Sequence, residues 1–511
     1  MLVAITYALC TILVVFYASA RLRMYRRNPK GLRYPPGPRP HFLLGNIRDL
    51  PTGGHEWIAL EEMSKKYNSD VIHFQVVSSH VVVLNSLQVA SDLLDKKSMI
   101  YSDRPRLPYA KELIGWSWSM VVMCYHEGFS AHRRIVQQSF QPSVVTSLHR
   151  PVMQSEVDKL LKNLLASPDD FADHLRSMAG AIVMMITYGY QVAPKDDPYV
   201  RLSEDVHNSG DRRMPVAHVV DLFPILRYAP ARLFEFKRRA LAARKLVYKM
   251  RNAPFQMVKE RLAAGTALPS MATSLLEKGV VADGIESEAL IKNCTAIIYG
   301  AGVDTTSAAL TNFFLAMIMY PEVQERAQRE LDAVVGKDRL PEFGDRPRLP
   351  YLACIIKEVL RWRATSALGI PHCTTTDDVY RGMFIPKGTT VIANLSAMLH
   401  DESVYPEPEV FNPDRFARGA GGSEGAPDPA RVAFGFGRRI CPGRFFADDV
   451  VWLAVVNILH IFKLEKKIGS DRRVLEPDVK WSSGPVSVPS SFGCKITLRL
   501  AGGESLIPSL E

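Results

Sequence analysis

The amino-acid sequence predicts a mainly helical domain with small β-sheets, preceded by one N-terminal transmembrane helix. Most of the 511 residues show helical periodicity, whereas β-branched runs are short and few. The stretch 291–320 is apolar on nearly every face, as expected of a long helix through the centre of a large domain. With 47% apolar residues and no internal repeat, the chain can bury one large core.

The N-terminus predicts the membrane helix. Residues 2–20 contain no charged side chain, and a helix of this length can just span a bilayer. The dense run of Arg and Lys after residue 20 places the rest of the chain in the cytosol. A cleaved signal peptide is the alternative, but residues 1–6 lack the basic side chains that usually open one. We therefore expect an anchor over 1–20, a basic linker and proline-rich hinge over 21–38, and one domain over 39–511.

Charge and cysteine content exclude several classes of protein. The net charge of +10 comes from basic residues that are dispersed beyond the N-terminus, and no nucleic-acid motif accompanies them. A membrane surface or an acidic protein partner is therefore the better interpretation, with no nucleic acid. The seven cysteines are odd in number and scattered, which argues against a disulfide framework and for a reducing compartment.

Two β-hairpins are predicted within the domain. The β-branched runs 71–77 and 81–84 are separated by Ser78-Ser79-His80 and read as one hairpin. A second hairpin is expected over 379–393, turning through Pro386-Lys387-Gly388.

The central helix carries polar residues where a buried helix would be expected to have none. Asp304 and Thr305 need partners, because an unsatisfied buried polar group costs roughly 1–3 kcal/mol. Gly300 and Gly302 each weaken the helix by about 1 kcal/mol relative to alanine. A glycine would let a ligand approach the backbone, and a hydroxyl beside a carboxylate can relay protons through water. A helix N-cap at Asp304 or Thr305 is the alternative.

Cys441 lies between a glycine-rich loop and an expected helix. Pro442 suits the first helical position, so a helix N-terminus and Arg439 would both favour a negative sulfur. The neighbouring cysteines, Cys373 and Cys494, are far away in the sequence, which excludes a closely spaced zinc site. Spacing alone leaves a disulfide open. A single thiolate beside basic residues also suits one bond to a haem iron.

Residues 434–443 resemble the haem-binding signature of the cytochrome P450 family, Phe-x-x-Gly-x-Arg-x-Cys-x-Gly. The matching positions are Phe434, Gly437, Arg439, Cys441 and Gly443. By this resemblance Cys441 is the axial ligand of iron in haem b, and the other four positions belong to the cofactor site.

Three further motifs resemble the same family and occur in its order. Residues 301–306 resemble its oxygen-activation motif, which places Ala301 at the haem and gives Asp304 and Thr305 the role of delivering protons. Glu358 and Arg361, three residues apart on one helix, resemble its Glu-x-x-Arg pair.

The resemblance also assigns one structural residue and two groups near the haem propionates. Arg415 would join the Glu-x-x-Arg pair, a structural role. Arg133 and His372 would lie near the propionates, with a solvated helix face and a surface histidine as the alternatives. Phe129 departs from the family pattern, which has tryptophan there, and so lacks the indole N–H donor.

The resemblance implies a microsomal, reductase-dependent haem-thiolate monooxygenase, of a type found in fungal secondary metabolism. Such an enzyme inserts one atom of O2 into a mainly apolar small organic substrate. Its electrons come from NADPH through cytochrome P450 reductase, with cytochrome b5 as a further partner. The domain over 39–511 would be the catalytic domain, facing the cytosol from a single-pass anchor in the endoplasmic reticulum membrane.

Two other functions stay open, and the substrate is not indicated. A haem-thiolate isomerase or dehydratase tends to lose the acid–hydroxyl pair that this chain retains. A non-enzymatic haem sensor would have no use for a proton relay. Detoxification is an alternative to secondary metabolism. By resemblance residues 195–244 form a variable lid over the substrate pocket, and 366–370 and 484–488 line it.

Overall fold

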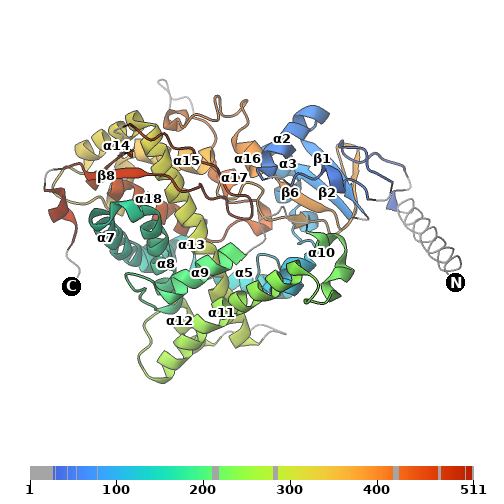
Figure 1. The fold of residues 1–511 in the computed structure, drawn as a ribbon, viewed down its shortest axis with the longest axis horizontal. Coiled ribbons are helices and arrows are strands. Elements are labelled where there is room, and N and C mark those ends of the chain that lie inside the picture. Colours follow the sequence, from blue (N-terminus) through green and yellow to red (C-terminus); the bar gives the residue numbers. More distant parts are fainter. Residues whose placement is uncertain are drawn as a thin grey trace.

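The computed structural model describes residues 27–508 apart from 29, 43, 53, 78, 210–217, 280–285, 418–424, 470–472 and 501. Its larger part is helical, and a small sheet region lies at one end (Figure 1). The α-helices are α2 (Glu56–Tyr67), α3 (Leu87–Ala90), α4 (Ser98–Tyr101), α5 (Glu127–Ser139), α6 (Pro142–Val144), α7 (Arg150–Ala166), α8 (Phe171–Tyr188), α9 (Pro198–Ser209), α10 (Val219–Leu222), α11 (Glu235–Ala263), α12 (Met271–Lys278), α13 (Ser287–Met319), α14 (Pro321–Val334), α15 (Pro350–Trp362), α16 (Leu395–Leu399), α17 (Ala430–Ala433) and α18 (Arg444–Ile461). The strands are β1 (Val71–Val76), β2 (Ser79–Leu84), β3 (His372–Cys373), β4 (Asp378–Tyr380), β5 (Met383–Ile385), β6 (Thr390–Ala393), β7 (Phe462–Lys466) and β8 (Cys494–Leu498).

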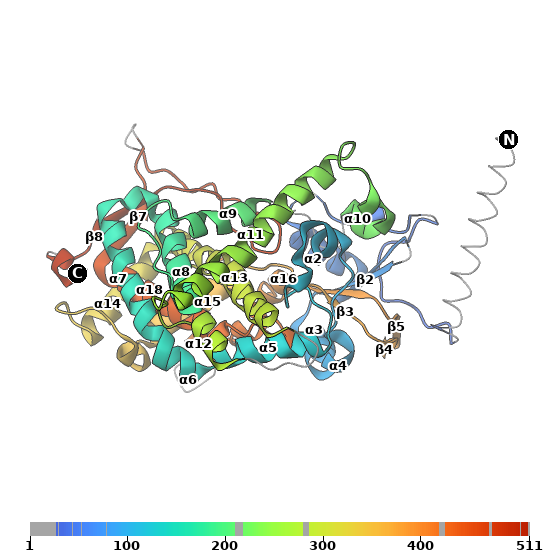
Figure 2. The ribbon, with the colours of Figure 1, turned by 90° about the horizontal axis from the view of Figure 1, so that it is seen from below.

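Helix α13 is the central helix that the sequence predicts. It runs without a break over 33 residues, and most of its side chains are buried. It lies among α8, α15 and α18, while α11 crosses over it with α9 alongside (Figures 1 and 2). Pro321 begins α14 directly after it, because proline cannot continue a helix but suits a first turn. Since α13 continues through Asp304 and Thr305, neither residue is a helix N-cap.

The first predicted hairpin is confirmed, whereas the second has a different turn. Strands β1 and β2 pair antiparallel over 71–84. In the second case β4 pairs with β5 through Arg381 and Gly382, which both have positive φ (48° and 77°), as a two-residue hairpin turn requires. Strand β6 then leaves this hairpin and joins β2 in parallel and β3 antiparallel. The larger sheet therefore has the order β1-β2-β6-β3.

The proline-rich segment predicted as a hinge is fastened to the sheets. The backbone N–H of His73 in β1 donates to the Pro36 carbonyl at 2.8 Å, and that of Phe384 in β5 donates to Arg33 at 2.8 Å. The ring of Tyr34 stacks on His73 with centroids 4.9 Å apart. Arg27 forms an ion pair with Asp377. Ordered attachment of the domain thus begins at the first residues that the structure describes.

The predicted membrane anchor over residues 1–20 lies outside the described residues, so the structure does not test it. Among the helices that the structure describes, none combines the length and hydropathy that a bilayer span requires.

Candidate functional site

A cavity of about 650 Å³ lies between α13 and the loop that carries Cys441. Helix α5, the segment 119–122 and the strand region around His372 close its sides, and lid residues from α9 to α11 cover it. The structure brings together almost all of the cofactor and catalytic residues predicted from the sequence. Those lining this cavity are Arg133, Ala301, Asp304, Thr305, His372, Phe434, Arg439, Cys441 and Gly443.

The loop before α18 presents the thiol of Cys441 to the cavity. The Cys441 N–H donates to the Phe434 carbonyl at 2.8 Å, which closes the loop. Burial raises the pKa of the Cys441 thiol, while the Gly443 N–H and the charges of Arg133 and Arg444 act in the opposite direction. A bound metal ion would lower the pKa of the Cys441 thiol and keep it as a thiolate, because a metal deprotonates the thiol that coordinates it.

Two sequence-based expectations about Cys441 are wrong in detail. Helix α18 begins at Arg444 with Gly443 as its N-cap, two residues later than the Pro442 start that the sequence suggests. Pro442 instead follows Cys441 in the turn that leads to the helix. Arg439 is not the cation beside the sulfur either, because its guanidinium is held by backbone carbonyls on the far side of the loop.

Gly437 explains why the signature requires a glycine within this loop. Its φ is +53°, in the left-handed region that other residues rarely adopt. A Cβ at this position would also lie 2.1 Å from the Leu94 carbonyl oxygen. The Gly437 N–H donates to Asp95 Oδ1 at 2.5 Å. The residue therefore fixes the loop against the segment 91–96, and it does not itself line the cavity.

Arg439 extends along one edge of the cavity. It donates to the carbonyl oxygens of Ser102 at 2.8 Å, Met120 at 3.1 Å and Met123 at 2.8 Å. Its guanidinium carbon lies 3.6 Å from the centre of the Phe129 ring, a cation–π contact. Phe129 thus acts on Arg439 through its ring face, in place of the N–H donor that it lacks. Burial lowers the pKa of Arg439 to about 10.

Arg104 is a second buried arginine at this edge, and the sequence analysis did not select it. Its Nη1 donates to the carbonyls of Ile370 at 2.7 Å and Pro371 at 2.6 Å. Burial, and then the charge of Arg439, lowers its pKa. His372 donates from Nδ1 to the Tyr101 carbonyl at 2.7 Å, and burial lowers its pKa to about 3. Its Nε2 is therefore the ring nitrogen left for a ligand.

Arg133, one turn after Phe129 on α5, differs from these two arginines. It is buried enough for desolvation to lower its pKa. Among the described residues this half-buried guanidinium has no hydrogen-bond partner and no ion pair, and the loss of hydration without a partner is costly. An unpartnered guanidinium at a cavity wall indicates an anionic ligand.

These observations fit a haem. Arg104, Arg133 and Arg439 supply positive charge for two carboxylates, and Cys441 supplies one thiol in the same cavity. Within the described part of the chain, no cluster of three or more His, Cys, Asp or Glu side chains could hold a metal ion. The donor set is therefore one thiolate and several cations, which suits an iron porphyrin and not a bare metal ion.

The opposite wall of the cavity is formed by α13. The Thr305 hydroxyl donates to the Ala301 carbonyl one turn earlier at 2.9 Å, and both residues are exposed to the cavity. Hydroxyls of this kind stay within the helix, which leaves the Thr305 oxygen able to accept a hydrogen bond from a ligand. Asp304 is only 7% exposed.

The carboxylate of Asp304 is held by two residues that sequence reasoning missed. Arg176 on α8 donates from Nη2 to Oδ1 at 2.5 Å. His207 on α9 donates from Nδ1 to Oδ2 at 3.1 Å. They stand 128 and 97 residues before Asp304, so no local pattern could have linked them to it.

The two glycines of α13 both line the cavity, and they also serve helix packing. A Cβ on Gly302 would lie 2.8 Å from the side chain of Val183 on α8. One on Gly300 would lie 3.2 Å from Met250 on α11. Both glycines let neighbouring helices approach α13 closely beside the cavity.

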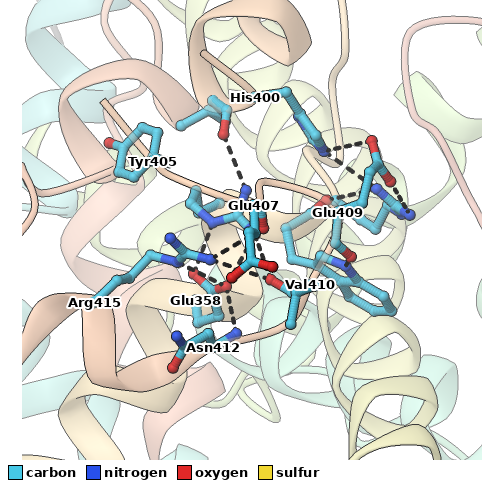
Figure 3. A network of polar contacts seen from close by, with 12 residues as sticks. Glu358, His400, Tyr405, Glu407, Glu409, Val410, Asn412 and Arg415 are labelled. Carbon is cyan, nitrogen blue, oxygen red and sulfur yellow. Dashed lines mark hydrogen bonds and ion pairs between the residues drawn. The ribbon is translucent and has the colours of Figure 1, made fainter. Parts of the chain in front are cut away.

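The Glu-x-x-Arg pair and Arg415 form a closed ionic cluster away from the cavity (Figure 3). Arg361 donates from Nε and Nη2 to the two oxygens of Glu358 at 2.7 and 2.9 Å, and both side chains are fully buried. Arg415 donates to Glu358 Oε1 at 3.1 Å, and the Asn412 N–H donates to the same oxygen at 2.8 Å. The remaining guanidinium donors bind carbonyls of the segment 399–410.

Comparison with known proteins decides the family. The Cytochrome P450 family model matches residues 35–488. The chain belongs to the cytochrome P450 family. Cytochrome P450 monooxygenase claR of Ampulloclitocybe clavipes is 41% identical over 93% of this chain and 88% of that relative. Cytochrome P450 monooxygenase 208 of Postia placenta is 37% identical over 100% of this chain and 98% of its own length. Cytochrome P450 monooxygenase ple1 of Rhodocybe pseudopiperita is 38% identical over 93% and 91%.

The protein is therefore a cytochrome P450 monooxygenase of fungal type, and the cofactor of its family is haem b. Its helical architecture with small sheets agrees with the P450 fold. P450 monooxygenases use a redox partner, O2 and an organic substrate.

Proposed function

We propose that this P450 is a membrane-anchored, reductase-dependent monooxygenase that oxidises a mainly apolar organic substrate in secondary metabolism. The observation that carries the proposal is the shared cavity. One wall presents the Cys441 thiol, the opposite wall presents the Thr305 hydroxyl, and arginines without carboxylate partners line the edge between them. A sensor would need neither the hydroxyl nor the buried acid next to it.

Cys441 is proposed as the axial ligand of haem iron. When bound, haem supplies the reductive activation of O2, and a thiolate ligand favours cleavage of the O–O bond. Arg104, Arg133 and Arg439 would hold the carboxylates of the porphyrin, with His372 Nε2 as a further partner. Phe434 and Gly443 shape the loop around the sulfur, and Ala301 borders the cofactor from α13.

Asp304 and Thr305 are proposed to deliver protons. Asp304, which lines the cavity, would take up a proton from water at Oδ2 and pass it through a bridging water to the Thr305 hydroxyl, which would give up its own proton to the cavity in return. His207 donates from Nδ1 to Oδ2 and so helps to hold the carboxylate. Arg176 keeps the carboxylate oriented during this transfer.

The cavity wall around the substrate space favours an apolar molecule. Its aliphatic side chains come from several separate parts of the chain, and they exclude water while offering few hydrogen bonds. They include Leu107, Ile114, Val183, Val206, Ile297, Leu395 and Val486. Lid residues Ser203, His207 and His218 add polar groups at the cover, which would orient an oxygen substituent.

The redox and membrane partners follow from what the chain lacks and where its charge lies. No flavin or nicotinamide motif is present in the sequence, so electrons must come from a separate NADPH-dependent cytochrome P450 reductase. The net charge of +10 suits an acidic partner, and cytochrome b5 is the second candidate. The anchor at 1–20 would place the catalytic domain on the cytosolic side of the endoplasmic reticulum.

Spectroscopy of the reduced protein with carbon monoxide tests the haem assignment. We expect the red-shifted Soret band of a thiolate-ligated haem, and we expect Cys441→Ser to lose it. A Cys441→Ser variant that keeps this band would contradict the ligand assignment.

Turnover with a fungal reductase and NADPH tests the reaction. A panel of terpenoids, fatty acids, polyketides, alkaloids and aromatic compounds is first screened by substrate-binding spectra. Product formation from the best ligand should require NADPH and O2 together. Conversion that proceeds without O2 would instead identify an isomerase or dehydratase.

The proton relay has a matched control on the same helix. Thr305→Ala should uncouple NADPH consumption from product and release peroxide. Thr311 donates to the Ser307 carbonyl one turn earlier at 2.7 Å, as Thr305 does to Ala301, but it lies outside the cavity lining. Thr311→Ala should therefore leave coupling unchanged. Equal coupling in the two variants would contradict the role of Thr305.

A further inference from the structure

A chain of hydrogen bonds joins three helices beside the cavity. Arg251 on α11 donates from Nε to Asn293 Oδ1 at 2.8 Å. Asn293, on α13, lies with Nδ2 3.1 Å from His132 Nε2. His132, on α5, lies with Nδ1 2.7 Å from the Gly128 carbonyl oxygen. The chain thus begins on the helix that crosses over the cavity and ends within the helix that carries Arg133.

Chemistry allows one direction for these hydrogen bonds. The Arg251 guanidinium can only donate, so the oxygen of the Asn293 side chain must face it and the amide nitrogen must face His132. The Gly128 carbonyl can only accept, so His132 carries its proton on Nδ1. Nε2 therefore accepts from Asn293, and the imidazole is neutral. Asn293 and His132 each accept from one side and donate to the other, which leaves a single arrangement.

Burial makes this arrangement costly to disturb. His132 is 2% exposed and Asn293 is 8% exposed. Helix α13 also holds the main chain of α5, because the Cys294 thiol points at the His132 carbonyl oxygen at 3.7 Å. Apolar residues could pack these helices without fixing their rotation, whereas a buried network with one allowed direction fixes it. The network therefore sets how α5 is turned about its axis.

The orientation of α5 matters because the face next to His132 meets the cofactor cavity. Phe129 and Arg133 line the cavity, and His132 directly precedes Arg133. Neighbouring residues point about 100° apart around a helix. A turn of α5 would therefore move the Arg133 guanidinium along the cavity wall and shift the Phe129 ring from its place on Arg439.

Arg251 also contacts the segment that holds Arg439. Its guanidinium carbon lies 5.5 Å from the centre of the Trp118 ring. Trp118 is followed by Met120 and Met123, whose carbonyls bind Arg439. The same side chain of α11 thus supports both arginines at the cavity edge, one through α5 and the other through the segment 118–123.

We propose that Arg251, Asn293 and His132 are positioning residues that place Arg133 and Arg439 against the carboxylates of the haem. The proposal rests on the haem-binding function proposed above. None of the three touches the cofactor, since none lines the cavity. Their effect passes through the orientation of α5 and the placement of the segment 118–123.

The test compares two variants and a control as purified full-length ferric holoproteins. Asn293→Leu removes the central link at similar volume, and Arg251→Met removes the donor while keeping an unbranched side chain. Lys249→Met is the control, because Lys249 is an exposed cation on the same helix. Transfer of haem to excess apomyoglobin gives the rate of haem loss, and resonance Raman spectra report the propionate bending bands.

Both variants should lose haem about three- to tenfold faster than the parent, in line with hydrogen bonds weakened at the propionates. Their propionate bands should shift, and the Soret band of the reduced carbon monoxide complex should stay that of a thiolate ligand. Lys249→Met should match the parent. Arg251 is half-buried, so Arg251→Met decides the question if Asn293→Leu fails to fold.

Unshifted propionate bands in Arg251→Met would overturn the proposal, even with faster haem loss, because general loosening of the fold does not reorient the propionates selectively. A parent protein without a thiolate-type Soret band would instead contradict the proposed function. The two failures are therefore distinguishable.

Discussion

The molecule buries arginines in two regions, and their partners differ. Arg361 and Arg415 share the carboxylate of Glu358, and their remaining donors bind carbonyls. At the cavity edge, Arg439 donates its hydrogen bonds to carbonyls and lies on the Phe129 ring, and Arg133 has no hydrogen-bond or ion-pair partner among the described residues. In the cluster around Glu358, the carboxylate that pairs with the arginines therefore comes from the chain itself.

The difference separates residues that build the fold from residues that bind a ligand. A buried cation needs a compensating negative charge, because desolvation is expensive. Where the chain supplies the carboxylate, the group stabilises the chain itself. Where it supplies none, the charge has to come from a ligand. Loss of Glu358 should therefore destabilise the fold, whereas loss of Arg133 should weaken cofactor binding.

The largest effect is expected for Glu358→Ala. It leaves the Arg361 and Arg415 guanidiniums buried without their carboxylate, and breaking such a pair costs about 3–5 kcal/mol. Urea unfolding of the holoprotein, followed by tryptophan fluorescence, measures the loss. Glu325→Ala on α14 is the control, because this exposed side chain should change the free energy by less than about 0.5 kcal/mol. Equal free energies of unfolding for the two variants would show that the ionic cluster does not stabilise the fold.

A buried pair of histidines, His73 and His80, avoids the cost of burying a charge in a third way, because His73 stays neutral. His73 Nε2 lies 2.9 Å from His80 Nδ1, and burial lowers the pKa of His73 to about 3. The unfolded chain binds a proton below its usual pKa of about 6.5 while the folded one does not. Stability from this group is thus complete above about pH 6.5 and falls towards pH 3.

His73→Phe should therefore make stability less dependent on pH. The ring keeps its stacking on Tyr34, and the free energy lost between pH 7 and pH 5 should shrink by roughly 2 kcal/mol. Urea unfolding at both pH values measures this. An unaltered pH dependence in His73→Phe would mean that His73 is protonated in the folded protein.

Arg133→Met should weaken cofactor binding but not the fold. Loss of a charge-assisted hydrogen bond to a propionate should raise the rate of haem loss roughly tenfold. The free energy of unfolding should fall by less than about 1 kcal/mol, because Arg133 has no hydrogen bond or ion pair to lose within the described part of the chain. Haem transfer to apomyoglobin measures the first quantity. The neighbouring Arg134 is exposed, so Arg134→Met should alter neither. Destabilisation as large as that of Glu358→Ala would erase the distinction between the two regions.

The smallest effect is expected for Phe129→Trp. The larger ring can keep the cation–π contact with Arg439 and adds an N–H that can donate to a propionate. Haem loss should slow by about two- to fivefold. Faster loss would show that the cavity edge has no room for the indole.

Local patterns were enough for the features that depend on neighbouring residues. The central helix, the first hairpin and the Cys441 loop each rest on residues close together in the chain, so their signals are readable without a fold. The second hairpin was mispredicted because Arg381 tolerates positive φ beside Gly382, a turn that the nearby Pro386 concealed. The start of α18 was placed too early because proline is only compatible with a first turn, and does not require one.

Long-range partners could not be predicted in the same way. Arg176 and His207 meet Asp304 only because α8 and α9 pack near α13. The positions of Gly300 and Gly302 were noticed, but the helices that approach them were not knowable from α13 alone. Arg439 could be assigned to the loop, whereas its direction away from the sulfur depends on carbonyls of the segment 102–123.

The hydrogen bonds and the ion pair that attach the segment 27–37 to the sheets limit how the domain can be oriented relative to the membrane. Arg27 is paired with Asp377, and Arg33 and Pro36 are hydrogen-bonded to β5 and β1. If residues 1–20 cross the bilayer as proposed, only the six residues 21–26 connect the membrane span to Arg27. Six residues reach about 20 Å when fully extended. A pull on the anchor would then reach the β-sheet directly, and the angle between the cavity mouth and the lipid surface would be restricted to a narrow range.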